Sequence, residues 1–281
     1  MDPVLPPEIE QEIFETAATR ERSVIPTLLR VCHRVHDWVE PILYRVLVIS
    51  DFDFPALAAL QSKPPTFKER AVRHVYIEYD GESAAQELLS EFPGIESLVI
   101  NGHHTQELLQ VMDALRPSRL NIWVPGTSIS RWPAATLSRP LFFRVTHLDL
   151  YRDPEPEDDD RQASWEEGWS TLASLSALTH LCLDHSLARD IIRPIVENCI
   201  SLKVMIAAFW SFHRGEEAAK FAQELPSTVR DVRVVVMTMA EFKEDWERGV
   251  RVGQDFWTRA ERFLERRRQG DIESSTYLLE D

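Results

Sequence analysis

A short apolar pattern recurs seven times between residues 70 and 237, and it constrains the fold more than any other feature of this sequence. Each copy has an apolar residue, two variable residues, an apolar residue, one variable residue and another apolar residue, as in VRHVYI, IESLVI, VTHLDL and LTHLCL. The shortest step between copies, Leu98 to Leu120, is 22 residues, and the longest, Leu148 to Leu181, is 33 residues. Such a repeat predicts stacked structural units. The central residues of the copies are Val75, Leu98, Leu120, Leu148, Leu181, Met205 and Val232.

The chain changes its periodicity between the copies. The stretches ESAAQELLSEF, TQELLQVMDAL, LARDIIRPIVENC and EEAAKFAQEL carry apolar residues three and four apart, which is the spacing of one helix face. Each unit is therefore a strand followed by a helix, and one unit alone is too small to bury its apolar side. We expect an α/β solenoid with parallel strands on one side and helices on the other. The alternative is an ordinary doubly wound α/β sheet, but no glycine-rich phosphate loop follows any strand.

Two copies carry a further resemblance at the end of the predicted helix. In ENCISLKVM, Cys199, Leu202 and Met205 occupy the helix end and the strand, and in EFPGIESLVI Phe92 takes the place of the cysteine. This arrangement resembles the leucine-rich repeat family in its helix-containing, cysteine-bearing variety. The resemblance covers roughly residues 70 to 237, but no copy has the family's asparagine-containing signature in full. It therefore implies an irregular leucine-rich-repeat-like solenoid.

The formal net charge of -15 argues against two classes of partner. A nucleic-acid surface needs an excess of lysine and arginine along one face, and an anionic membrane repels an acidic protein. No apolar run approaches the roughly 20 residues of a membrane span, and the first residues lack the basic and apolar regions of a signal peptide. We therefore expect a cytoplasmic or nuclear protein that binds neither nucleic acid nor membrane. Cys32, Cys182 and Cys199 have no metal-like spacing and are expected to be reduced thiols.

The first fifty residues contain a different pattern. In PPEIEQEIFETAA, Ile9, Ile13 and Phe14 fall on one helix face, and Pro7 suits a first helical turn. A second helical stretch follows, which Pro41 should end or restart, and YRVLVI then alternates like a strand. Three short helices in about forty residues bury too little surface to be stable alone, so we expect them to lean on another surface. The apolar stripe of the second stretch is Leu28, Val31, Cys32, Val35, Trp38 and Val39.

The order of residues in this opening region resembles an F-box over residues 5 to about 47. Leu5 and Pro6 match its leading Leu-Pro, the two helical stripes match its first helices, and RVCHRVHDW and PILYRVL match its later segments. The segment ATRERSVIP between the helices departs from the common pattern, as does Tyr44, which stands where a tryptophan is usual. The region is especially similar to short F-box-like proteins abundant in mushroom-forming fungi.

This resemblance implies a substrate receptor of a Skp-cullin-F-box-type ubiquitin ligase. The opening helices would insert apolar side chains into a Skp-type adaptor, which carries the cullin, and the repeats would hold a target protein of unknown identity. The chain would act by proximity, so we expect no enzyme activity and no cofactor. The adaptor-binding candidates are Leu5, Pro6, Ile9, Ile13, Leu28, Val31, Val35 and Trp38.

The main alternative is a ligase-independent interaction or structural protein whose F-box has drifted and only caps the first strand of the solenoid. Exposed adaptor-binding candidates favour the receptor, whereas burial of these residues against the repeats favours the cap. Ile13 and Val35 also suit a purely structural role, in which they pack the three helices together.

The variable positions of each strand are expected to line the concave sheet face, away from the helices, because side chains alternate along a strand. Aromatic residues mixed with isolated charges suit a protein-binding surface. The same positions have a second interpretation as strand residues partly covered by the C-terminal segment. The target-binding candidates are Tyr76, Trp123, His147, Tyr151, His180, Trp210 and Arg233.

One cluster on this face invites a sharper hypothesis. His147 and Asp149 occupy places equivalent to His180 and Cys182 in the next copy, so these four side chains are expected to converge. Such ligands suit zinc, but a flat ladder of strands gives poor tetrahedral geometry, and we predict no metal site. Cysteine-histidine catalysis lacks an orienting third group and an oxyanion donor.

The remaining segments complete the predicted organisation. The acidic run from Asp153 to Asp160 is expected to be a solvated loop, or else a docking patch for a basic target. The stretches MAEFKEDWERGVRV and DFWTRAERFLERRRQG predict helices that cover the end of the solenoid, or that bind a partner. The predicted domains are an F-box-like three-helix module (1–47), a leucine-rich-repeat-like solenoid (48–238) and a C-terminal helical cap and tail (239–281).

Overall fold

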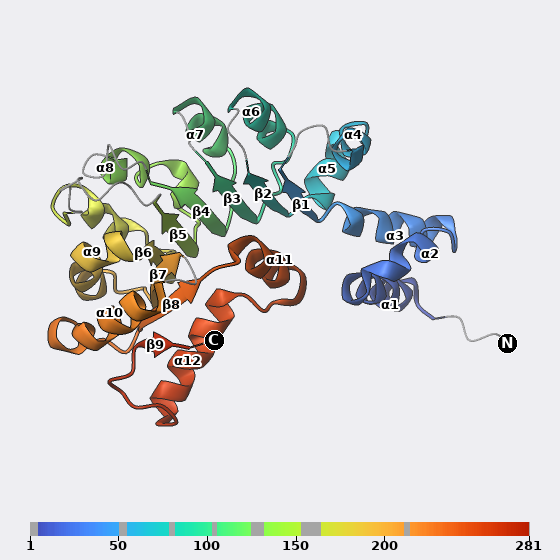
Figure 1. Ribbon diagram of the computed structural model, residues 1–281. Helices are drawn as coiled ribbons and strands as arrows, with labels where there is room; N and C mark the ends of the chain where they lie inside the picture. The colour runs from blue at the N-terminus through green and yellow to red at the C-terminus, as the bar shows by residue number, and fades with distance from the viewer. Residues whose placement is uncertain are drawn as a thin grey trace.

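The computed structural model describes residues 5–50, 55–78, 82–102, 106–124, 132–152, 164–210 and 214–280. Within these residues, nine strands form one sheet in which every neighbouring pair is parallel (Figure 1). Their spatial order follows the chain and never reverses as it does in a doubly wound sheet, so the fold is α/β and compatible with a solenoid. The strands are β1 (Val46–Ile49), β2 (His74–Glu78), β3 (Ser97–Asn101), β4 (Arg119–Trp123), β5 (His147–Tyr151), β6 (His180–Asp184), β7 (Val204–Trp210), β8 (Val234–Met239) and β9 (Leu278–Leu279).

The helices that connect β1 to β8 lie on one side of the sheet (Figure 1). The four helices predicted from the apolar periodicity are confirmed as α6, α7, α9 and α10, whereas α4, α5 and α8 were not predicted. The described part of the connection between β5 and β6 contains the 3-10 segment Trp169–Ser174. The bounds are α4 (Pro55–Gln61), α5 (Pro65–Ala71), α6 (Glu82–Ser90), α7 (Gln106–Met112), α8 (Trp132–Thr136), α9 (His185–Asn198) and α10 (Gly215–Thr228).

The strand register confirms six of the seven predicted central residues. Val232 is wrong, because Val234 is the residue that pairs with Met205. The Asp231 carboxylate accepts the backbone N–H of Arg233 at 2.8 Å, and this local turn delays the start of β8 by two residues. The confirmed row runs across the sheet through Val75, Leu98, Leu120, Leu148, Leu181 and Met205.

A ladder of hydroxyl groups joins successive units just before the strands. Ser118 Oγ donates to the carbonyl of Glu96 at 3.2 Å, Thr146 Oγ1 to that of Ser118 at 2.9 Å, and Thr179 Oγ1 to that of Thr146 at 3.2 Å. Each donor stands two residues before the central row, so the same bond recurs from unit to unit. The same carbonyl groups also accept backbone N–H groups of the following unit, so the hydroxyl groups reinforce the bonds between neighbouring units.

The main core lies between the sheet and the connecting helices. The place occupied by Cys199 is filled in other units by Phe92, Phe142 and Leu175, each six residues before the central row. All four side chains are buried, so this place is an apolar plug of variable size.

The opening region forms three α-helices, which project beyond the first edge of the sheet (Figure 1). They are α1 (Pro7–Arg20), α2 (Ile25–Leu28) and α3 (His33–Leu43). The prediction that Pro41 ends or restarts the second stretch is wrong, because Pro41 lies inside α3. Its missing N–H removes one hydrogen bond only two residues before the helix ends, so the helix tolerates it.

The chain folds back after β8. The predicted C-terminal helices are confirmed as α11 (Phe242–Val252) and α12 (Phe256–Gln269). They lie on the sheet face opposite α4–α10, within the curve of the sheet, and do not simply close its end (Figure 1). β9 then pairs with β8 and forms the last edge of the sheet.

Candidate functional site

The opening helices carry an apolar stripe that is open to solvent. Ile9 and Ile13 lie one turn apart on α1 and Leu5 precedes this helix by two residues, and Leu5, Ile9 and Ile13 are 45%, 44% and 51% exposed. Val31, just after α2, is 53% exposed, and Pro6 is exposed as well. Five of the eight adaptor-binding candidates therefore lie on the surface of this chain.

Val35 has a different position from the exposed candidates, because it is only 2% exposed. It belongs to a small separate core with Ala18, Ile25, Val39 and Ile42, so its side chain holds the three helices together. Leu28 and Trp38 border this core and are half-buried. Of the two residues that also suited a structural role, Val35 fills it and Ile13 is left outside.

The opening module is joined to the sheet through α3, which contacts α5. The Lys63 ammonium forms an ion pair with Glu40 at 2.7 Å, and the rings of Tyr44 and Phe67 meet edge to face at 5.8 Å between centroids. Because the joint uses the end of α3, the apolar stripe on α1 is not needed to attach the module.

The concave face of the sheet is covered by α11 and α12. Two apolar clusters lie on this side of the sheet, apart from the main core. The larger cluster packs α12 against the last strands, and the smaller one packs α11 against the first strands. Any partner of these strands would have to displace the two helices first. The α12 side chains of the larger cluster are Phe256, Trp257, Ala260, Phe263 and Leu264, and their strand partners include Cys182, Val204, Ile206, Val235 and Met237.

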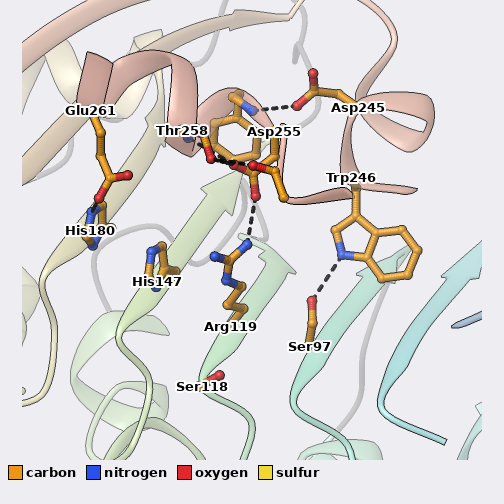
Figure 2. Close-up of polar contacts among 12 residues, drawn as sticks. Ser97, Ser118, Arg119, His147, His180, Asp245, Trp246, Asp255, Thr258 and Glu261 are labelled. Atoms are coloured by element: carbon orange, nitrogen blue, oxygen red, sulfur yellow. Dashed lines mark hydrogen bonds and ion pairs between the residues drawn. The ribbon is translucent and has the colours of Figure 1, made fainter. Parts of the chain in front are cut away.

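Hydrogen bonds and an ion pair hold the two helices to the sheet (Figure 2). The indole N–H of Trp246 donates to Ser97 Oγ at 3.1 Å, and Arg119 pairs with Asp255 at 2.7 Å. The Asp255 carboxylate also accepts the N–H of Thr258 at 2.9 Å, which caps the start of α12. A Cβ at Gly249 would lie 2.5 Å from the Cβ of Asp255, so α11 approaches the start of α12 only because this residue is glycine.

His147 and His180 stack on each other beneath α12. Their ring centroids are 4.0 Å apart with an angle of 7° between planes, and Trp257 meets both rings edge to face. Glu261 lies 3.0 Å from Nε2 of His180 (Figure 2). Burial lowers the pKa of His147 to about 3, with a further contribution from His180. Burial also lowers the pKa of His180, which Glu261 partly opposes, so both rings are neutral at pH 7.

Asp149 and Cys182 form the second pair of the predicted cluster. The register places them side by side, and Asn121 donates to the Asp149 carboxylate at 2.5 Å. Burial raises the pKa of Asp149 to about 7 and raises that of the Cys182 thiol well above its usual range. The cysteine is therefore a protonated thiol, which is a poor nucleophile and a poor metal ligand. In the described parts of the chain, no three His, Cys, Asp or Glu side chains are arranged to hold a metal ion.

The other target-binding candidates are engaged within the molecule. Tyr76 is buried against Phe242 and Trp246 of α11, and its pKa is raised to about 12 by burial. The Tyr151 hydroxyl donates to Ile100 O or Asn101 Oδ1, both within 3.1 Å. Trp123 is buried, and Trp210 packs edge to face on Phe242 at 5.4 Å.

Arg233 also has a role inside the molecule. Its guanidinium pairs with Asp231 at 2.7 Å and donates to the carbonyl groups of Cys199 and Leu202 just beyond α9, each at 3.3 Å. It also donates to the carbonyl of Val196 in the last turn of α9, and it therefore ties the start of β8 to the end of the preceding helix. The Arg233 guanidinium therefore makes its contacts within the molecule.

The second interpretation of the concave face, in which the C-terminal segment covers the strand residues, is the one that the structure shows, and the sequence contains a signal for it. Val99, Ile206 and Val235 stand at positions predicted to be exposed, yet they are large and apolar. Strands that are buried on both faces are continuous apolar runs, as in VMIAAF of β7 and VVVM of β8. The partners Arg119 and Asp255 carry no such signal, because they lie 136 residues apart.

Comparison with known proteins shows no family model that matches this chain, and no curated protein that matches it either. The described helices include none that combines the length and the apolar character needed to cross a membrane. The acidic run from Asp153 to Asp160 lies outside the described residues.

Proposed function

We propose that this chain is the substrate-receptor subunit of a Skp-cullin-F-box-type ubiquitin ligase. In this role the opening helices bind a Skp-type adaptor, and the remainder of the chain holds a target protein near the ubiquitin-loading enzyme. The chain contributes proximity and no reacting group. The F-box resemblance of residues 5 to about 47 and the leucine-rich-repeat-like resemblance of residues 70 to 237 motivate this proposal.

The observation that carries the proposal is the exposed stripe of Leu5, Ile9, Ile13 and Val31. Four large apolar side chains within 27 residues are an unusual concentration on a small helical module, and such patches mark interaction sites. A drifted F-box that merely caps the first strand would bury these side chains against the repeats. Their exposure therefore favours the receptor over the ligase-independent alternative.

The adaptor surface consists of Leu5, Pro6, Ile9, Ile13 and Val31, with Leu28 and Trp38 at its border. Val35 supports this surface from inside the module. Binding would bury the apolar stripe, and at about 25 cal/mol per Å² a few hundred Å² of such surface contributes several kcal/mol of transfer free energy, which offsets part of the cost of association.

Reconstitution with a purified Skp-type adaptor tests the proposal. We expect the full chain to capture the adaptor, and the variant L5A with P6A to lose capture. The variant I9S with I13S should lose it too. Both variants should keep the melting temperature, because the replaced side chains make little contact inside the chain. Val252→Ser is the matched control, since Val252 is an exposed valine on α11. Failure of the unmodified chain to capture the adaptor would contradict the proposal. Capture by either variant at the level of the unmodified chain would contradict it as well.

A further inference from the structure

Three exposed apolar side chains gather at one edge of the sheet. Outside the opening helices, the large apolar side chains that the described residues expose are Phe143, Ile200, Val232 and Val252. The first three are 59%, 90% and 56% exposed and lie in the segments that lead into β5, β7 and β8. Because all strands are parallel, these segments meet at the same edge, where the strands begin.

Each of these segments also presents an exposed cation. Arg144 follows Phe143, Lys203 lies three residues after Ile200, and Arg230 lies two residues before Val232. None of the three cations forms an ion pair with a described residue, although Arg230 donates to the carbonyl of Pro226. We call Phe143, Arg144, Ile200, Lys203, Arg230 and Val232 the basic edge.

Three carboxylates at this end of the sheet are already paired with other arginines. Glu96 pairs with Arg73 at 3.5 Å, Asp231 with Arg233 at 2.7 Å, and Asp113 with Arg139 at 2.6 Å. The basic edge is therefore locally positive in a chain whose formal net charge is -15. Its position after α9 and α10 accounts for part of the charge, since cations are favoured near helix C-termini, but not for the exposed apolar side chains.

The backbone under these side chains is held in place. Arg267 of α12 donates to the carbonyl of Val232 at 2.6 Å, and the Arg233 guanidinium donates to the carbonyl groups on both sides of Ile200, those of Cys199 and Leu202. The N–H of Phe143 donates to the carbonyl of Pro140 at 3.2 Å. A surface presented on a fixed backbone loses little conformational freedom on binding.

We propose that the basic edge is the surface that binds the target, and that the target segment carries carboxylates interleaved with large apolar side chains. The identification of the occupant as a ligase target rests on the proposed function. Three observations select this occupant: the local positive charge, the three apolar side chains beside the cations, and the closure of the concave face by α11 and α12. Neighbouring strands are about 4.8 Å apart, so the distance from β5 to β8 is about 14 Å and suits at least four extended residues.

Selection from a library of random twelve-residue peptides displayed on phage, with the full chain as bait, tests this proposal. We expect the selected peptides to combine Asp or Glu with Leu, Ile, Phe or Trp, and to bind more weakly at higher salt. The charge variant R144E with K203E and R230E should weaken a selected, fluorescein-labelled peptide by about tenfold or more. The apolar variant F143S with I200S and V232S should do the same. Both should melt close to the unmodified chain, because the replaced groups are on the surface.

The control variant combines Lys220→Glu with Val252→Ser, which alters one exposed cation and one exposed valine away from the basic edge and should bind the peptide normally. The proposal would be overturned if the selected peptides were neutral or basic, or if no peptide were enriched. It would also be overturned if the edge variants bound the selected peptide as tightly as the unmodified chain. So would a dimer in sedimentation velocity that the apolar variant abolishes, or binding of a labelled twelve-nucleotide single strand that displaces the peptide. The edge variants should still capture the Skp-type adaptor, so failure here and failure of the receptor function are separate outcomes.

Discussion

The opening helices and the C-terminal helices have similar apolar faces, but one face is exposed and the other is buried. Both regions contain short amphipathic helices at an end of the chain. In α12 the apolar side chains are buried against the concave face, whereas Ile9 and Ile13 on α1, with Leu5 just before it, form a stripe that is left open. The difference lies in the partner that the chain itself offers. The last strands present a broad apolar face to α12, whereas the opening module joins the rest of the chain through the contact of α3 with α5.

This comparison shows that amphipathic periodicity identifies an apolar helix face without saying whether its partner lies in the same chain. The size of the apolar side chains helps to decide whether the partner lies in the same chain. The α12 stripe is rich in Phe and Trp, which each bury a large area, whereas the α1 stripe is aliphatic and discontinuous with any core. Truncation of a side chain on the covered face should therefore lower the free energy of unfolding far more than truncation of one on the open face.

The largest expected effect is on the covered side. Trp257→Ala should lower the free energy of unfolding by about 3–5 kcal/mol, because Trp257 is buried between α12, the histidine pair and Phe256. Urea denaturation, monitored by far-UV circular dichroism, measures this loss in the free energy of unfolding. The exposed Val252→Ser on α11 is the control and should change stability by no more than about 0.5 kcal/mol. A loss below about 1 kcal/mol for Trp257→Ala would mean that α12 does not cover the sheet.

The next effect concerns the ion pair between sheet and cover. Asp255→Ala should cost about 3 kcal/mol, because it leaves Arg119 without its carboxylate partner and removes the cap of α12. Asp255→Asn keeps an oxygen that can accept the Thr258 N–H, so its loss should be smaller. Thermal and urea unfolding of the two variants provide the comparison, and equal losses would show that the charge contributes nothing.

Acid should weaken the covered side. The pKa of His147 is about 3 in the folded chain and near 6.5 in the unfolded chain, so below pH 6.5 the unfolded state binds the additional proton and stability falls. Between pH 6.5 and pH 5 this one group accounts for about 2 kcal/mol. His147→Asn should remove that dependence. The raised pKa of Asp149 acts in the opposite direction but is present in both proteins. Parallel stability curves for the two proteins over this range would exclude the neutral histidine.

The opening module provides a matched pair, the buried Val35 and the exposed Ile13, and the smallest effect of all is expected for Ile13. Val35→Ala should cost about 2 kcal/mol, because its side chain fills the core of the opening module. Ile13→Ala should stay within about 0.5 kcal/mol, because half of its side chain faces water. Hydrogen exchange of α1 and α3 amides reports the local stability of the module. A larger loss for Ile13→Ala than for Val35→Ala would reverse the assignment of inner and outer faces.

The strands and most helices were predictable because their signal is local. Alternation and the central row placed β2 to β7 in the correct register, and the helical spacing of three and four placed α6, α7, α9 and α10. Val232 misled the prediction because it is apolar and β-branched but lies in a turn set by Asp231. β9 was not predicted because two residues, Leu278 and Leu279, are too few to show alternation.

The relation between distant segments was not predictable in the same way. The exposed stripe on α1 follows from its four-residue spacing, but the cover over the concave face depends on contacts between residues more than a hundred positions apart, such as Arg119 with Asp255. The target-binding candidates on that face followed from the interpretation in which the face is open, whereas the structure shows the second interpretation, in which the C-terminal segment covers it. The basic edge needs the parallel topology before its six residues come together, since they are spread over residues 143 to 232.

Hydrogen–deuterium exchange of the full chain, with and without a reconstituted Skp-type adaptor, tests the central claim most directly. We predict that the adaptor slows exchange over residues 5–31, where the apolar stripe lies, and leaves α11, α12 and the strands beneath them unchanged. Exchange that slows in the sheet and its C-terminal cover while residues 5–31 stay as in the free chain would contradict the account.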